Sequence, residues 1–123
     1  MYISELRQRL NETKDINRQG ELLYEYSHET WENNFRLKAN TAERLYKCTA
    51  WIWYDIADSI IWLRSYKTIV GCYDFQTNTL FQFGRYSMTT YQHFSKLRKY
   101  IRENFLDIPY CMHEFNCEIE NWF

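Results

Sequence analysis

Glycine, proline and long apolar runs are scarce in this sequence, and each scarcity excludes something. The 123 residues include three glycines and one proline, which argues against a disordered or linker-rich chain. No apolar run approaches the roughly 20 residues needed to cross a bilayer. The opening residues, MYISELRQRL, lack a basic segment followed by an apolar one, so we expect no secretory signal. We therefore predict a single domain over residues 1–123 that works in the cytoplasm.

Recognisable catalytic motifs are also missing. The sequence contains no HExxH, no GxSxG and no GxxxxGK[ST] phosphate loop. It has three histidines, His28, His93 and His113. A nucleophilic cysteine would need one of them within hydrogen-bond reach, and nothing in the sequence brings His93 to a cysteine. We therefore predict that the protein is not an enzyme and that it has no resident cofactor.

Aromatic residues, in contrast, are abundant. They make up 20% of the chain, with 5 Trp, 11 Tyr and 8 Phe. Large rings stiffen a core when they are buried. On the surface, Trp and Tyr are the residues that most often anchor a protein partner. The composition is compatible with both uses.

The order of periodic segments predicts an α+β fold. Ile3, Leu6 and Leu10 are spaced as on one face of a helix over residues 2–14. Gly20 is interpreted as a break or helix cap before a second helix. Closely spaced turns between short apolar runs predict a four-stranded antiparallel meander at about 51–84. Helices on one face of this sheet complete the expected domain. Its predicted helices are 2–14, 21–35, 41–48 and about 88–106, its strands are 51–54, 59–63, 68–73 and 80–83, and the tail from 110 is irregular.

The charge is nearly balanced overall but unevenly distributed. The net charge is −1, so no global field attracts nucleic acid or lipid. Residues 85–103 carry five basic side chains and one acidic side chain, and residues 104–123 carry four acidic side chains and no Lys or Arg. These two blocks either neutralise each other within the fold or face different partners.

Cysteine and histidine cluster near the end of the chain, at Cys111, His113 and Cys117. Zinc prefers thiolate and imidazole ligands in a tetrahedral set of four. This spacing differs from the closer pairs of common zinc motifs, and a fourth ligand would have to come from Cys48, Cys72, His28 or His93. The alternative is reduced thiols and a surface histidine.

Two further groups are candidates for binding. Arg64 and Tyr66 follow one expected strand, and Arg85 and Tyr86 follow another. Such residues at the rim of a sheet can anchor a protein or simply protect an edge from aggregation. The second group lies on or beside the polar face of the last helix, where basic residues could contact phosphates or form an ordinary solvated surface. Its members are Arg85, Lys96, Lys99 and Arg102.

Two runs carry a resemblance to a known group of proteins. They are Trp62-Leu63-Arg64-Ser65-Tyr66-x-Thr68-x-Val70, followed by Tyr73-Asp74, and Gly84-Arg85-Tyr86-Ser87-x-Thr89-Thr90-Tyr91-Gln92-His93-x-x-Lys96. Residues 50–101 resemble small uncharacterised proteins of phages and mobile elements of Gram-positive bacteria. The resemblance implies a strand–strand–helix unit and carries no function residue by residue.

In general character, the chain is similar to anti-CRISPR proteins. The analogy implies a phage or prophage accessory protein that binds a host protein, such as a CRISPR effector nuclease, and inhibits it by steric occlusion. We expect contacts from Arg64, Tyr66, Arg85 and Tyr86, and from the tail acids Glu114, Glu118 and Glu120, which could imitate phosphates. A nucleic-acid-binding module is the alternative, and a zinc-stabilised structural module is a third hypothesis. The oligomeric state is left open by the sequence.

Overall fold

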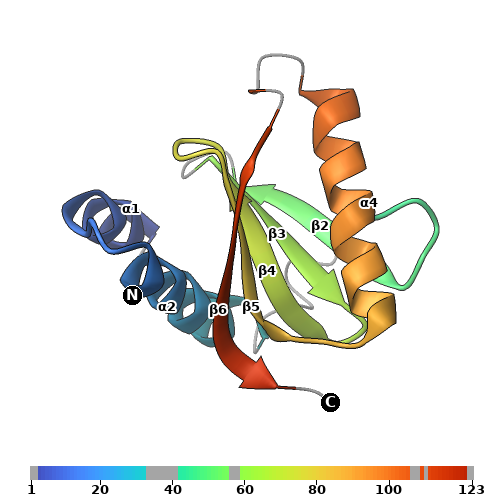
Figure 1. Cartoon of the computed structure of the whole chain (residues 1–123), viewed down its shortest axis with the longest axis horizontal. Helices are drawn as coiled ribbons and strands as arrows, with labels where there is room; N and C mark the ends of the chain where they lie inside the picture. The colour runs from blue at the N-terminus through green and yellow to red at the C-terminus, as the bar shows by residue number, and fades with distance from the viewer. Residues whose placement is uncertain (1–2, 33–41, 56–58, 106–108, 110, 122–123) are drawn as a thin grey trace.

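The computed structural model describes residues 3–32, 42–55, 59–105, 109 and 111–121. Within them, three α-helices and a short π-helix accompany one six-stranded sheet (Figure 1). The predicted α+β class is confirmed. The helical elements are α1 (Ile3–Glu12), α2 (Ile16–Ser27), η1 (His28–Glu32) and α4 (Met88–Asn104). The strands are β1 (Glu43–Arg44), β2 (Ala50–Asp55), β3 (Ile60–Ser65), β4 (Thr68–Asp74), β5 (Thr79–Arg85) and β6 (His113–Asn121).

The sheet is a mixed sheet in which the predicted meander forms the centre. Its strands follow one another in sequence order from β1 to β6. Neighbours from β1 to β5 are antiparallel, whereas β6 pairs with β5 in parallel. The four central strands correspond to the four predicted ones, because β-branched and aromatic side chains suit a pleated surface that is buried. The prediction of four strands underestimates the sheet, because β1 and β6 add one strand at each edge.

The predicted helix at 41–48 is wrong for the residues the structure describes. Residues 42–48 contain the short strand β1 and then a turn. Tyr46 and Lys47 have φ angles of 46° and 60°, which belong to the left-handed region and are incompatible with a right-handed helix. Thr41, residues 33–35 of the second predicted helix and residue 106 of the last one lie outside the described residues.

We expected Gly20 to break or cap a helix. Instead, it lies within α2. The helix begins earlier, at Ile16, because the side chain of Asp15 caps it by accepting a hydrogen bond from the backbone N–H of Asn17 at 3.0 Å. A Cβ atom at Gly20 would overlap the sulfur of Cys117 in β6. The absence of a side chain at Gly20 therefore allows this close approach of helix and strand, and a larger residue would force the Cys117 side chain to move.

The tail is not irregular, because residues 113–121 form β6. Phe115 and Cys117 are half-buried against the core, as expected for alternate residues of a strand with one covered face, whereas Ile119, after the bulge, is exposed and Glu120 is half-buried. The pairing with β5 shifts register between Gln82 and Gly84, and Glu118 takes a φ angle of 52° at this bulge.

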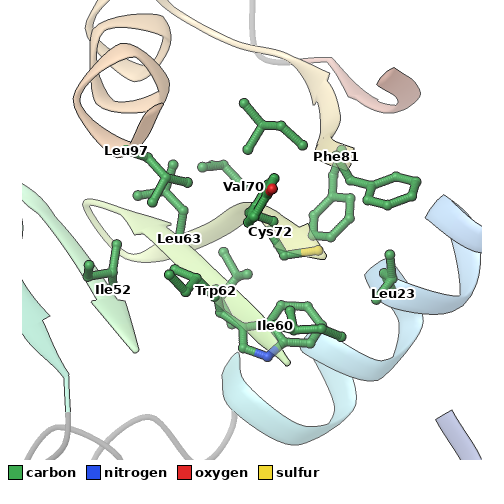
Figure 2. Close-up of a cluster of buried hydrophobic side chains, with 14 of the residues drawn as sticks. Leu23, Ile52, Ile60, Trp62, Leu63, Val70, Cys72, Phe81 and Leu97 are labelled. Atoms are coloured by element: carbon green, nitrogen blue, oxygen red, sulfur yellow. The ribbon is translucent and has the colours of Figure 1, made fainter. Parts of the chain in front are cut away.

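Helices cover both faces of the sheet, which corrects the prediction of one covered face. In Figure 1, α4 lies on one side of the strands and α1 and α2 lie on the other. Figure 2 shows Leu97 of α4 on the side of Leu63, whereas Leu23 of α2 lies on the side of Ile60 and Phe81. The central strands are consequently buried on both faces, and β3 has five buried residues out of six. Full burial of each large apolar side chain contributes about 1.5–3 kcal/mol.

Candidate functional site

A small hollow lies where the β3–β4 hairpin meets the N-terminus of α4. It has a volume of about 170 Å³, and we call it the hairpin hollow. Most of its exposed lining is apolar. The lining residues are Ser65, Tyr66, Thr68, Val70, Tyr86, Ser87 and Thr90. They come from both runs that carry the resemblance, so two segments about 20 residues apart meet at one place on the surface.

Local geometry holds the walls of the hairpin hollow in place. Tyr66 takes a φ angle of 55° in the two-residue turn of the hairpin, and its backbone N–H donates to the carbonyl of Thr49 at 2.8 Å. On the other wall, Ser87 caps α4 by accepting a hydrogen bond from the backbone N–H of Thr90 at 3.4 Å. The two walls are thereby tied to β2 and to the helix, respectively.

A buried polar network joins these walls. Ser65 Oγ lies 2.7 Å from His93 Nδ1 and 3.0 Å from Thr90 Oγ1. On its other side, His93 Nε2 lies 3.4 Å from Thr49 Oγ1. Ser65, Thr90 and His93 are 3%, 6% and 2% exposed, so each needs such partners. Burial, and then the charge of Lys96, lowers the pKa of His93, which favours the neutral ring.

Within this network, Ser65 and His93 form a Ser–His pair of the kind found in enzymes with a serine nucleophile. A neutral His93 can accept the Ser65 proton at Nδ1, which is the first requirement of an activated nucleophile. In hydrolytic triads, a carboxylate orients the histidine from its other nitrogen. Here that nitrogen faces the Thr49 hydroxyl instead. These contacts form a network that fixes the hairpin to α4. From the sequence, we considered His93 as a partner for a cysteine, but its ring nitrogens face the hydroxyl groups of Ser65 and Thr49.

The predicted Arg and Tyr anchors differ in their exposure. Tyr66 is 49% exposed at the rim of the hairpin hollow. Arg64 is partly buried, with its guanidinium carbon 5.7 Å from the centre of the Trp51 ring. Tyr86 is only 2% exposed, because its ring packs into the core between the sheet and α4. Among these residues, Tyr66 and Arg85 have the exposure that a surface anchor requires, and the Arg85 side chain is 59% exposed.

The tail acids are engaged within the fold. Glu114 accepts a hydrogen bond from Arg98 at 2.7 Å, and Glu118 accepts one from Arg85 at 2.8 Å. In these two pairs, the basic block 85–103 and the acidic block 104–123 neutralise each other within the fold. Because Arg85 and Glu118 are 59% and 61% exposed in their side chains, their pair is worth little in water.

Glu120 is the centre of a cluster that the sequence did not indicate, which we call the Glu120 cluster. Its carboxylate accepts hydrogen bonds from the hydroxyls of Tyr24 and Tyr86 at 2.8 and 2.9 Å, and it lies 3.1 Å from His28 Nε2. The carboxylate is 14% exposed. Burial and the charge of Glu120 raise the pKa of Tyr86, so Tyr86 stays a donor. The cluster fastens β6 to α2 and to the end of β5.

The basic residues proposed for nucleic acid do not form one free surface. Arg85 is paired with Glu118, and Lys99 lies 3.8 Å from Glu103. The ammonium of Lys99 also lies 5.1 Å from the centre of the Tyr46 ring. Lys96 is half-buried and Arg102 is exposed on α4. This arrangement leaves fewer positive charges for phosphates than the sequence suggested.

The proposed zinc ligands are spread along the chain, with Cys111 before β6, His113 at its start and Cys117 in its middle. Cys111 and His113 are exposed, whereas Cys117 packs against Gly20. Burial raises the pKa of Cys117 to about 12, and zinc binds the thiolate form. No group of three or more His, Cys, Asp or Glu side chains within the described ranges is placed to hold a metal ion.

Comparisons with family models, with curated proteins and with solved structures find no match to this chain. For the part of the chain that the structure covers, no helix is both long and apolar enough to span a membrane.

Proposed function

We propose that this protein binds a partner protein and that the hairpin hollow receives an apolar side chain of that partner. The size of the hollow supports this assignment. Sites for drug-sized molecules usually have about 300–1,000 Å³, whereas this hollow has about 170 Å³. A cavity of roughly 150 Å³ accepts one benzene-sized group. One Leu, Met or Phe side chain is an occupant of suitable size.

The two most exposed large apolar side chains of the described residues are Tyr66, which lines the hollow, and Met88, which follows the lining residue Ser87 in the chain. Met88, at the start of α4, is 72% exposed, and Tyr66 is 49% exposed. A ring beside a small apolar hollow is a typical arrangement for a binding hot spot. The exposed Tyr66 ring in the lining of this small apolar hollow is the observation that carries the proposal.

The hollow is also formed before binding. The Ser65–His93–Thr90 network fixes one wall and the Ser87 cap fixes the other. Binding to a preorganised site avoids the cost of ordering side chains, which is about 0.5–1.5 kcal/mol for each one immobilised. The polar network therefore contributes to affinity by holding the walls of the hollow in place before binding.

For the identity of the partner, we propose a host protein that is inhibited by a phage or prophage accessory protein. The resemblance of residues 50–101 supports this choice, and the hollow is built from the runs that carry it. A CRISPR effector nuclease is the specific partner to test first, with steric occlusion as the mechanism. The tail acids are not needed for this mechanism, and Glu114 and Glu118 are paired with Arg98 and Arg85 of the same chain.

The test uses DNA cleavage by purified effector nucleases of the bacterial host. We expect wild-type protein to inhibit cleavage and the double variant Tyr66→Ala/Met88→Ala to need at least a tenfold higher concentration. The matched control is Ile16→Ala, which removes a side chain that is 38% exposed at the start of α2, and it should inhibit as well as wild type. Melting curves confirm that all variants are folded.

A second measurement separates the general proposal from the specific partner. A photo-crosslinking phenylalanine at position 66 should yield an adduct with one host protein, and Met88→Ala should reduce its yield. If the adduct forms without inhibition of any nuclease, the binding function stands and the nuclease is wrong. If binding is instead to nucleic acid, it should weaken steeply between low and moderate salt, which would overturn the proposal.

A further inference from the structure

A second hollow lies at the opposite end of α4, beside β1 and the start of β3. Its volume is about 150 Å³, and we call it the aromatic hollow. Aromatic residues and one carboxylate dominate its lining. The lining residues are Glu43, Ile52, Trp53, Tyr54, Ile61, Tyr100 and Phe105. It shares no residue with the hairpin hollow.

The rings around the aromatic hollow form a connected cluster. The centre of the Phe105 ring lies 5.7 Å from that of Tyr54 and 6.5 Å from that of Tyr100. Phe75 supports Phe105 from behind, with ring centres 4.8 Å apart. Such contacts hold the rings in defined positions, so the three rings border the hollow from the sheet, from the helix and from the residue that ends the helix.

Negative charge lies at the rim. The hydroxyl of Tyr100 donates to Glu43 at 3.1 Å. This hydrogen bond uses one acceptor site of a carboxylate that has about four. Burial and the hydrogen bond to Glu43 raise the pKa of Tyr100, so its ring remains neutral. An exposed carboxylate thus stands beside electron-rich rings, and both attract cations.

The same part of the molecule already holds one cation on a ring. Lys99 Nζ lies 5.1 Å from the centre of the Tyr46 ring, and the Tyr46 and Tyr100 rings are in contact at 6.4 Å. The charge of Lys99 is compensated by Glu103 at 3.8 Å. The aromatic hollow, with Glu43 at its rim, offers comparable surroundings to a cation from outside.

We infer that the aromatic hollow binds a quaternary ammonium group. Aromatic cages recognise such cations because the charge is spread over methyl groups and is weakly hydrated. Primary ammonium groups are strongly hydrated, which makes them poorer occupants of a largely apolar hollow. The volume fits a trimethylammonium group, since a cavity of this size accepts a benzene-sized guest. This inference does not rest on the partner proposed for the hairpin hollow.

The probe for this site is tetramethylammonium, titrated against the full chain and followed by the NMR shifts of the Trp53, Tyr54 and Tyr100 rings. We expect saturable binding, and at least fivefold weaker binding of tert-butanol, which has a similar shape and no charge. Equal shifts with both probes would show that the hollow selects only for apolar bulk, and this would overturn the inference.

Variants separate the rings from the carboxylate. Tyr100→Phe keeps the ring and should bind tetramethylammonium within about twofold of wild type, whereas Tyr100→Leu should weaken binding at least fivefold. Glu43→Gln should weaken it by a smaller factor, because Glu43 is exposed and its charge is screened. Ile16→Ala, whose side chain is 38% exposed and lines neither hollow, is the control and should leave tetramethylammonium binding unchanged. Binding that is unaffected by Tyr100→Leu, or is absent at about 100 mM probe, would contradict the inference.

Discussion

Arg7 of α1 and Asp74 at the end of β4 form a two-pronged ion pair, with guanidinium nitrogens 3.2 and 3.1 Å from the two carboxylate oxygens. The side chains are 14% and 3% exposed. Asp74 also accepts a hydrogen bond from the backbone N–H of Gln76 at 3.0 Å. One carboxylate therefore fixes both the first helix and the β4–β5 turn.

We expect Asp74→Ala to destabilise the protein by about 3–5 kcal/mol, because it leaves the Arg7 charge buried without this partner. The measurement is the free energy of unfolding in urea. The double variant Asp74→Ala/Arg7→Met should recover part of the loss, since an apolar side chain of similar length replaces the charge. A loss below 1 kcal/mol for the single variant, or no recovery in the double variant, would contradict this account.

The sequence predicted the central strands and α4 well, and the reason is periodicity. Leu97 and Ile101 belong to a clear helical stripe, and the strands are dense in β-branched and aromatic residues. Turn chemistry misled the prediction at residues 42–48, where an N-cap-like pattern precedes a left-handed turn at Tyr46 and Lys47. At these residues, pairing between β1 and β2 overrides the local preference for a helix.

The sequence contains a strand pattern for β6, although the tail was predicted to be irregular. Phe115 and Cys117 alternate with polar residues, which is typical of a strand with one covered face, and the bulge at Glu118 then leaves Ile119 exposed. Its parallel pairing to β5, however, depends on contacts between distant segments, such as Cys117 against Gly20. No local pattern encodes these contacts.

The candidate site was predictable only in part. Tyr66 was singled out and lies at the rim of the hairpin hollow. Ser65 and His93 were not recognised as a pair, because 28 residues separate them and the hairpin and α4 bring them together. The aromatic hollow has the same origin, since Glu43 and Tyr100 meet only in the folded protein.

Gly20 offers a test of the contact between α2 and β6. In an isolated helix, Gly→Ala stabilises by about 1 kcal/mol. Here we expect Gly20→Ala to destabilise the protein, because the added methyl group would overlap the sulfur of Cys117. Thermal melting should show a lower midpoint for Gly20→Ala and a recovery in Gly20→Ala/Cys117→Ala, in which only the overlapping sulfur is removed. A single variant more stable than wild type would show that β6 does not pack on this residue.

Two glutamates of β6, only two residues apart, should differ greatly in their importance. We expect Glu120→Ala to cost about 2–4 kcal/mol, because it removes the acceptor of the Tyr24 and Tyr86 hydroxyls. Glu118→Ala should cost at most about 0.5 kcal/mol, since its pair with Arg85 is exposed. Chemical unfolding of both variants measures the difference. Equal costs would refute the assignment of the Glu120 cluster as the main fastening of the tail.

The lowered pKa of His93 predicts a dependence of stability on pH. The unfolded chain takes up a proton on this histidine near pH 6.5, whereas the folded protein does so only at lower pH, because burial and Lys96 lower the pKa. Between these two pKa values the unfolded state binds more protons, so stability rises with pH. The contribution of His93 is complete above about pH 6.5 and is lost as the pH falls below it.

The variant His93→Asn isolates this contribution. Its amide oxygen can replace Nδ1 as a partner of Ser65 and does not titrate, so we expect a cost of about 1 kcal/mol at pH 7.5 and a smaller cost at pH 5.5. Urea unfolding of both proteins at the two pH values provides the comparison, and the remaining titrating groups are common to both. If the difference between wild type and variant is the same at both pH values, His93 is not held neutral by burial between the hairpin and α4.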